Sequence, residues 1–249
     1  MRPLIPFAGI ALFVVAWHVV VITTGAPLVP TPGQAALAIG ELAQKGLLFK
    51  YVVASLFRVT WGYLLALVVA VPMGVMLGMS PLAQSALNPY LQILRPISPL
   101  AWIPIAILWF GVGDLSAVFL IFLSSFFPLA LAAMQAVQSV EPVHLASGRN
   151  FGLSRLQLLR HVVFPAVLPQ LIVGMRIALG IAWLVVVAAE MIAVNSGLGF
   201  LIVDARNAGN RYDLVVAGMV LIGAIGVVLD LMMRRLERFD FVRWGYAEP

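Results

Sequence analysis

The sequence has no cysteine among its 249 residues, and only 10% of them are charged. Without cysteine the chain forms no disulfide, no thiolate metal site and no cysteine nucleophile. About a quarter of the residues in a soluble domain are charged, so this scarcity of charge excludes an ordinary soluble fold. The three histidines, His18, His144 and His161, do not cluster, which argues against a metal site.

Two further observations narrow the function. No stretch matches the glycine-rich GxxxxGK[ST] loop that cradles phosphates, so we expect this chain itself to bind neither ATP nor another cofactor. The formal net charge is +5. However, the basic residues flank apolar runs and do not line one face, which argues against a nucleic-acid partner.

Long apolar runs dominate the chain. Hydrophobic residues make up 63% of it, and its mean hydropathy is +1.07. A run of about 20 apolar residues crosses a bilayer as a helix, so the sequence predicts an all-α integral membrane protein in contact with lipid. About six transmembrane helices are expected, over residues 4–22, 59–79, 87–110, 115–138, 162–194 and 212–233. The third run contains Pro89, Pro96, Pro99 and Pro104.

The distribution of lysine and arginine predicts the orientation, because loops rich in these residues stay in the cytoplasm. We interpret the first run as a retained helix and not as a cleaved signal peptide. Nine arginines then fall on the inner side and four basic residues on the outer side, so both termini are cytoplasmic. The expected parts are a first helix with its outer connection (1–50), a membrane core (51–236) and a cytoplasmic tail (237–249).

Residues 141–161 form a polar, basic island between two apolar runs. Ser154 and Gln157 have the spacing of a capping box, in which each side chain satisfies a free backbone N–H at a helix start. With Gly152 as a hinge, this polar island predicts two short helices that could fill a groove on a partner protein. The alternative is an ordinary solvated loop. The expected contact residues are Ala146, Ser147, Gly148, Arg149, Asn150, Phe151, Gly152, Leu153 and Ser154.

Three charged residues lie within or beside the apolar runs: Arg58, Arg176 and Glu190. A charge at mid-membrane costs at least a few kcal/mol, so each of these side chains should either face a water-filled pathway through the membrane or pair with a neighbouring helix. Positions 176 and 190 are about 21 Å apart along a helix, too far for a mutual ion pair. Arg58 is the expected partner of Glu190, because both lie towards the outer surface.

The predicted outer connection, residues 195–213, follows the fifth run. Gly197 and Gly199 permit backbone turns, and the stretch LGFLIVDAR can form a short helix that dips back towards the pathway. The alternative is a plain outer loop whose charges are solvated. The candidate gate or pathway residues here are Asn195, Ser196, Asp204 and Arg206.

The polar island resembles the cytoplasmic loop of ABC importer permeases, the inner-membrane components of binding-protein-dependent transport systems. In that loop a Glu-Ala-Ala triplet is followed by a glycine. The loop ends with the sequence apolar–x–Leu-Pro. Here the triplet is Ala146-Ser147-Gly148, so the glutamate is missing, and Phe164 replaces the leucine before Pro165. Residues 28–34, 94–114, 174–207 and 236–244 resemble the nitrate, sulfonate and taurine branch of these permeases.

This resemblance implies a type I ABC importer transmembrane domain that forms a translocation pathway in a bacterial inner membrane. It also implies a pair of ATPase subunits that bind ATP and Mg, a periplasmic or lipoprotein substrate-binding protein, and a second permease copy. The implied substrate is a small anion, such as an aliphatic sulfonate, taurine, nitrate or bicarbonate, with an outer gate near residues 195–213.

Two other classes of membrane protein are alternatives to an ABC permease: a secondary transporter and an intramembrane serine hydrolase. A self-sufficient secondary transporter often shows internal repeats; none is evident here, and the polar island would serve no purpose. An intramembrane serine hydrolase needs a base beside its nucleophile. Ser196 is the only suggestive serine, and the predicted topology places no histidine on its side of the membrane. The sequence therefore favours a non-catalytic permease.

Overall fold

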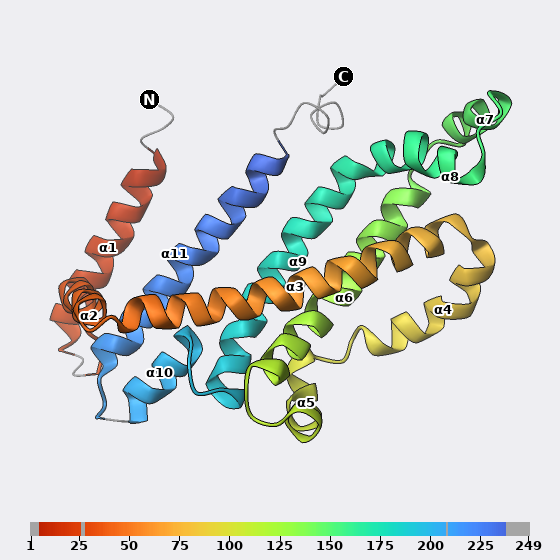
Figure 1. The fold of residues 1–249 in the computed structure, drawn as a ribbon. Helices are drawn as coiled ribbons and strands as arrows, with labels where there is room; N and C mark the ends of the chain where they lie inside the picture. Colours follow the sequence, from red (N-terminus) through yellow and green to blue (C-terminus); the bar gives the residue numbers. More distant parts are fainter. Residues whose placement is uncertain (1–4, 26–27, 208, 238–249) are drawn as a thin grey trace.

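Helices build the described structure. The computed structural model describes residues 5–25, 28–207 and 209–237, and within these ranges it has no strand. The parts of the predicted first helix, outer connection and tail that fall on residues 1–4, 26–27 and 238–249 lie outside the described residues. The helices (Figure 1) are α1 Ile5–Thr24, α2 Pro32–Gln44, α3 Leu47–Met79, α4 Pro81–Leu94, α5 Ile103–Phe110, α6 Asp114–Gln138, α7 Pro142–Asn150, α8 Arg155–Leu158, α9 Phe164–Ala193, α10 Leu198–Asn207 and α11 Tyr212–Leu236.

The long helices form a membrane-sized bundle. α6, α9 and α11 run with a similar slant, and α3 packs across α6 and α9 (Figure 1). Helices α7 and α8 lie at one end of this bundle, whereas α5 and α10 lie towards the other end (Figure 1). Among the described residues, five helices are long and apolar enough to span a bilayer, or six if one bent pair counts as a span. The predicted all-α membrane fold is therefore confirmed.

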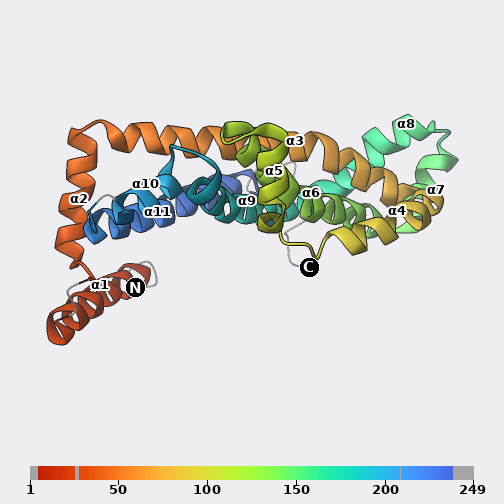
Figure 2. The ribbon, with the colours of Figure 1, turned by 90° about the horizontal axis from the view of Figure 1, so that it is seen from below.

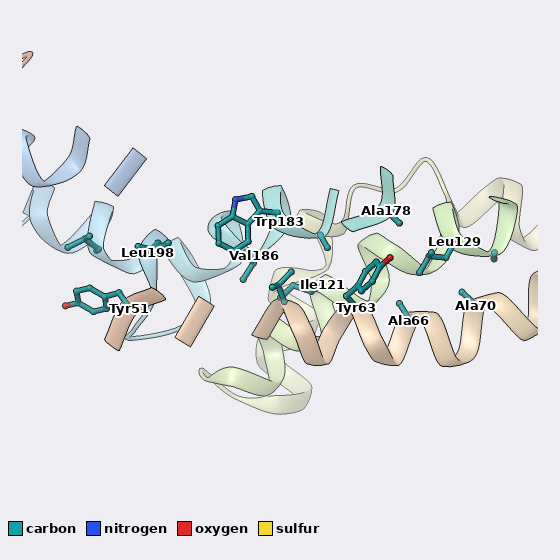
Figure 3. Close-up of a cluster of buried hydrophobic side chains, with 14 of the residues drawn as sticks. Tyr51, Tyr63, Ala66, Ala70, Ile121, Leu129, Ala178, Trp183, Val186 and Leu198 are labelled. Carbon is teal, nitrogen blue, oxygen red and sulfur yellow. The ribbon is translucent and has the colours of Figure 1, made fainter. Parts of the chain in front are cut away.

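Small residues let α3 and α6 approach closely. Ala66 and Ala70 of α3 are fully buried and face Leu129 of α6 (Figure 3). A methyl group added at Gly74 would overlap the backbone carbonyl of Ala130. Helix pairs in membranes gain their stability from such close packing, because lipid supplies no hydrophobic force between them.

Two hydrogen bonds connect α9 to its neighbours. The Tyr63 hydroxyl on α3 donates to the backbone carbonyl of Met175 on α9 (2.8 Å). The indole N–H of Trp183 on α9 donates to the backbone carbonyl of Ile222 on α11 (3.0 Å). Trp183 itself is buried in the core that Figure 3 shows. α9 is thus the central helix against which α3, α6 and α11 pack.

The third predicted span is not one continuous helix. The interruption predicted within residues 87–110 is confirmed: α4 ends at Leu94, a single 3-10 turn covers Pro99–Trp102, and α5 begins at Ile103. The helical part starts earlier than predicted, at Pro81. The two parts are bent by 83°. Proline lacks the N–H that a helix needs and clashes with the preceding turn, so Pro96 and Pro99 account for the break.

The second span begins earlier than residue 59, where the sequence placed it. α3 begins at Leu47, so its first four turns include Lys50 and Arg58. Arg58 does not end the helix, because its side chain is buried and ion-paired. The predicted boundary between residues 50 and 51 consequently lies inside α3.

The polar island contains the predicted glycine turn but only one independent helix. The capping box between Ser154 and Gln157 is confirmed, and Gly152 adopts a φ of +77°. The second helix, α8, is a single turn. It continues through a π-helical turn at Leu159–Val163 into α9, so that Arg155–Ala193 is one helical run of 39 residues.

The first helix stands beside the bundle. Figure 2 shows α1 set apart from α9 and α11, with α2 leading back to α3. Its described side chains are mostly exposed and apolar; Phe7 and Phe13 are examples. α2 is attached to the start of α11 by an ion pair between Glu41 and Arg211 (2.7 Å).

Candidate functional site: the polar island and the Arg58 cluster

Backbone turns and glycine packing hold the polar island in shape. The Gly152 N–H donates to the Arg149 carbonyl (2.9 Å), and the Leu153 N–H donates to the Gly148 carbonyl (3.1 Å). Gly148 is buried against α8, where an added methyl group would lie 2.5 Å from Cδ1 of Leu158. Because the φ of Gly152 is positive, any other residue there would be strained. The two glycines therefore fix the angle between α7 and α8.

The surface of the polar island is apolar at its centre and basic around it. Phe151 is 87% exposed and Leu156 is 75% exposed. Arg149 and Arg155, which lie next to them in the sequence or within two residues, are exposed as well. An open groove of about 450 Å³ lies between α7 and the first turn of α9, with Phe151 on its wall. An exposed aromatic side chain flanked by arginines is typical of protein–protein contacts, which favours docking over a solvated loop.

The predicted contact residues differ in exposure. Gly148 is buried and Leu153 is half-buried, so these two support the shape of the element. The other members of the predicted set are exposed and available to a partner: Ala146, Ser147, Arg149, Asn150, Phe151, Gly152 and Ser154.

A buried ion pair joins α3 to α9 at the opposite end of the bundle. Nη1 of Arg58 donates to Oε1 of Glu190 at 2.7 Å, which confirms the pairing expected from the sequence. The Arg58 side chain is 2% exposed and the Glu190 side chain is fully buried. A charge in so apolar a setting is stable only when it is paired and hydrogen-bonded, and both conditions hold here.

Glu190 also closes the start of α10. Its Oε2 accepts from the Ser55 hydroxyl (2.9 Å) and from the Gly199 N–H (2.9 Å). The Ser55 hydroxyl in turn accepts from the Leu198 N–H (2.9 Å). A carboxylate at a helix N-terminus satisfies free N–H groups and complements the helix dipole. α10 is thereby fastened to α3 and α9 by buried polar groups.

The other edge of Arg58 reaches α6 and the loop before α10. Its Nε and Nη2 lie 2.8 Å and 2.7 Å from Oδ1 of Asp114, the first residue of α6. Nη1 also donates to the Ser196 carbonyl (2.7 Å), and Nη2 donates to the Ser196 hydroxyl. We call Ser55, Arg58, Asp114, Glu190 and Ser196 the Arg58 cluster. One guanidinium thus connects α3, α6, α9 and the loop that leads to α10.

The remaining candidate residues lie apart from this cluster. Arg176 pairs with Glu237 (2.8 Å) and Asp230 (3.6 Å), which ties α9 to α11 and keeps it away from Glu190, as expected. Asn195 is exposed next to the cluster, and the predicted short helix after it exists as α10. Asp204 and Arg206 are exposed on that helix.

The sequence reasoning missed two members of the cluster, Ser55 and Asp114. Asp114 directly follows the stretch Gly111-Val112-Gly113 and starts an apolar run, a position where an acid complements a helix start. That signal marks a cap and does not reveal a partner. Ser55 is one turn before Arg58, so its proximity to Glu190 follows once the Arg58–Glu190 pair is assumed.

The contacts of Ser196 do not favour the serine-hydrolase alternative. The Ser196 hydroxyl accepts a hydrogen bond from a guanidinium, which cannot serve as a base. Among the described residues, the Ser196 hydroxyl has no hydrogen bond to a carboxylate or a histidine, so the base that a serine nucleophile requires is not in contact with it.

The family described as the binding-protein-dependent transport system inner membrane component matches residues 62–239. The chain belongs to this family. Its members are permeases, so the chain is a membrane component of an ABC transport system and not an enzyme. Among solved structures, the MetNI methionine ABC transporter in inward-facing conformations has a chain that superimposes with a TM-score of 0.69 at 19% identity, over 79% of this chain and 97% of that one. The fold is that of a type I ABC importer permease.

Curated relatives belong to the branch that the resemblance indicated. The taurine transport system permease protein TauC of Escherichia coli is 35% identical over 235 residues, covering 91% of this chain and 84% of the relative. The aliphatic sulfonates permease SsuC of Bacillus subtilis is 33% identical over 236 residues (94% and 85%). The nitrate import permease NrtB of Synechocystis is 34% identical over 242 residues (93% and 87%).

Proposed function

We propose that this permease forms the pathway of an ATP-driven importer for a small anion of the sulfonate, taurine, nitrate or bicarbonate type. The observation that carries the proposal is the continuity of the polar island with α9. A partner that binds the exposed face around Phe151 acts directly on a helical run of 39 residues. A flexible loop at this place would not transmit a movement.

The partners follow from this arrangement. A pair of ATPase subunits binds ATP and Mg and docks on residues Ala146 to Ser154, with Phe151 as the apolar anchor and Arg149 beside it. One chain carries one polar island, so a second permease copy engages the second ATPase subunit. A substrate-binding protein delivers the anion on the other side. Its chemistry sets the choice among anions, and the support for the anion class is the names of the curated relatives.

The Arg58 cluster serves as the gate at the far end in this proposal. α9 carries Glu190 at that end, about 54 Å from Ser154 at 1.5 Å per residue. A movement of α9 shifts Glu190 relative to Arg58 on α3 and relative to the start of α10. Asn195 and Ser196 would line the opening, and Asp204 and Arg206 would face the binding protein from α10.

The proposed orientation puts the polar island and both termini in the cytoplasm of a bacterial inner membrane. The absence of cysteine from the chain makes a direct test possible. Single cysteines at Ser147 and Asn195 should react with a membrane-impermeant maleimide from opposite sides, S147C only after the cells are opened and N195C in intact cells. Labelling of both from the same side would contradict the orientation.

The docking proposal is tested by co-purification and by ATP hydrolysis. F151A should weaken recovery of the ATPase subunits with the permease, because it removes the most exposed aromatic side chain of the polar island. F7A is the matched control, since Phe7 on α1 is 71% exposed and lies far along the chain from the polar island.

Taurine, nitrate or bicarbonate with the binding protein should stimulate hydrolysis by the assembled complex. Stimulation only by solutes that lack an oxyanion group, or uptake without any ATPase, would reject the proposed function.

A further inference from the structure

Arg58 uses its two edges for different tasks. Nη1 is committed to the interior, where it contacts Oε1 of Glu190 and the Ser196 carbonyl, both at 2.7 Å. Nε and Nη2 form the other edge, and both lie on the single oxygen Oδ1 of Asp114. This edge presents two parallel N–H groups, the geometry that matches two oxygens of a sulfonate, nitrate, phosphate or carboxylate. Asp114 therefore lies where an oxyanion could bind this edge, and it contacts the edge through one oxygen only, Oδ1.

The two acidic partners of Arg58 differ sharply in accessibility. The Glu190 side chain is fully buried, whereas that of Asp114 is 59% exposed. Asp114 also follows Gly111, whose φ of +74° gives the preceding segment a turn that few other residues adopt. A carboxylate that is largely in water can leave Arg58 at little cost, provided that another anion takes its place.

A pocket lies beside the contact between Arg58 and Asp114. It has a volume of about 310 Å³, and its walls include Arg58, Asp114, Ser196 and Lys50. Lys50 is exposed and has no ion pair among the described residues. Arg58, Lys50 and Ser196 thus border one small space, and Asp114 is the one acidic residue among its lining residues.

The rest of the pocket is apolar. Phe49, Val53 and Phe57 of α3 line it and are each substantially exposed. A short alkyl chain fits against such side chains, whereas an ion alone gains nothing from them. The arrangement suits a small molecule with an oxyanion head and an apolar body, and the head alone would suffice for nitrate.

We propose that this pocket is an oxyanion site and that Asp114 is its built-in occupant, displaced when the ligand binds. The proposal rests on the proposed function, because the ligand is the transported anion. The exchange conserves charge: one anion on the Nε–Nη2 edge replaces another, while Glu190 keeps its place. It also releases the start of α6 from α3, so arrival of the ligand loosens the Arg58 cluster.

The test measures anion binding by the whole permease–ATPase complex without the binding protein. Isothermal titration with taurine, methanesulfonate and nitrate would be done in nanodiscs of zwitterionic lipid. D114N should bind at least one of these anions about tenfold more tightly than the unmodified complex, because removing a tethered competitor raises the fraction of open sites. E41Q is the matched control, since Glu41 is an ion-paired acid of α2 outside the pocket.

A second pair of variants tests the cationic wall. K50Q should weaken binding of the same anion several-fold, whereas K45Q should not, because Lys45 pairs with Glu41 outside the pocket. The K50Q comparison keeps the proposal testable if D114N fails to fold. Equal binding by D114N and the unmodified complex, or by K50Q and K45Q, would overturn the proposal.

Repeating the titration in nanodiscs with phosphatidylglycerol separates the two sources of an oxyanion. If this lipid suppresses the gain of D114N, its headgroup phosphate competes for the pocket and the site is supported. The proposed function is judged separately, by anion stimulation of ATP hydrolysis in the unmodified complex with its binding protein. A stimulated complex whose D114N variant gains no affinity would reject the site and leave the transport proposal standing.

Discussion

Arg58 and Glu190 carry two buried charges, and each charge is stable in the interior only because the other is paired with it. Removing one partner of a buried pair leaves an uncompensated charge and costs about 3–5 kcal/mol. R58Q should therefore lower the free energy of unfolding by that order, and E190Q by less, because Asp114 still pairs with Arg58. The double variant should lose clearly less than the sum, since neither charge is then left alone.

Thermal unfolding of the purified protein in detergent checks this double-mutant cycle. The charge-swapped variant R58E/E190R extends it and should recover assembly in part. Strictly additive losses in the cycle would show that the 2.7 Å contact contributes nothing to stability.

Glu41 gives a pH-dependent contact outside the spans. Hydrogen bonds from Arg211 and then from Lys45 lower the pKa of its carboxyl from 4.5 to about 2. A carboxyl with a lowered pKa stabilises the folded state above its ordinary value, and this contribution is lost as the pH falls through the lowered one. The stability difference between the unmodified protein and E41Q should thus be constant above pH 4.5 and shrink between pH 4.5 and 2.

Unfolding of both proteins followed over this pH range measures the difference directly. R211Q should abolish most of it, because Arg211 is the larger cause of the shift. A difference that stays constant down to pH 2 would contradict the prediction.

At the residue scale, the sequence predicted the Arg58–Glu190 pair because a lone charge in an apolar helix demands a partner. It did not predict Asp114 or Ser55, whose ordinary roles at a helix start and on a helix face explain them without any long-range contact. Only the packing of α3 across α6 and α9 brings them to Arg58.

Among the elements, the α3–α6 contact depends on the missing side chain of Gly74. An added methyl group would overlap the Ala130 carbonyl, and such overpacking costs about 1–3 kcal/mol. G74A should therefore lower the free energy of unfolding by about that amount. G180A is the matched control on α9, because a methyl group there meets nothing within 4 Å.

Thermal unfolding of the two variants distinguishes them. Helix propensity alone would favour alanine at both positions by up to about 1 kcal/mol. A G74A variant as stable as G180A would mean that α3 and α6 move apart without cost.

The elements also show where periodicity and composition stop being informative. Apolar runs located every long helix, because the requirement for length and low charge acts locally. They did not locate the 83° bend between α4 and α5, since the length and low charge of a run carry no information about its direction. Pro96 and Pro99 marked an interruption but not its angle. The predicted start of α3 is wrong because the charge-free run begins only after Arg58, whereas the helix continues through this buried, ion-paired residue.

At the scale of the whole molecule, the polar island and the Arg58 cluster are connected through α9. A flexible joint between them should uncouple the two ends. Replacing Leu159 and Val162 in the π-helical turn by glycine lowers local helix stability by about 1 kcal/mol per position. The L159G/V162G complex should still assemble with its ATPase, but its ATP hydrolysis should respond much less to the anion.

Alanine at the same two positions is the control, because alanine preserves the helix. Comparison of the two double variants by co-purification and by anion-stimulated hydrolysis measures the coupling. Full stimulation in the glycine variant would exclude α9 as the connecting element.

The length of the run from α8 to α9 has a mechanical consequence. With 39 residues it is about 58 Å long, and its ends lie at the two sites. Treated as a stiff rod that pivots near its α8 end, it amplifies small rotations into large displacements. A tilt of only about 5° would move the Glu190 end by roughly 5 Å by the same helix dimensions, which exceeds the reach of the 2.7–2.9 Å hydrogen bonds there. The molecule thus needs little motion at one membrane surface to separate Glu190 from Arg58 at the other.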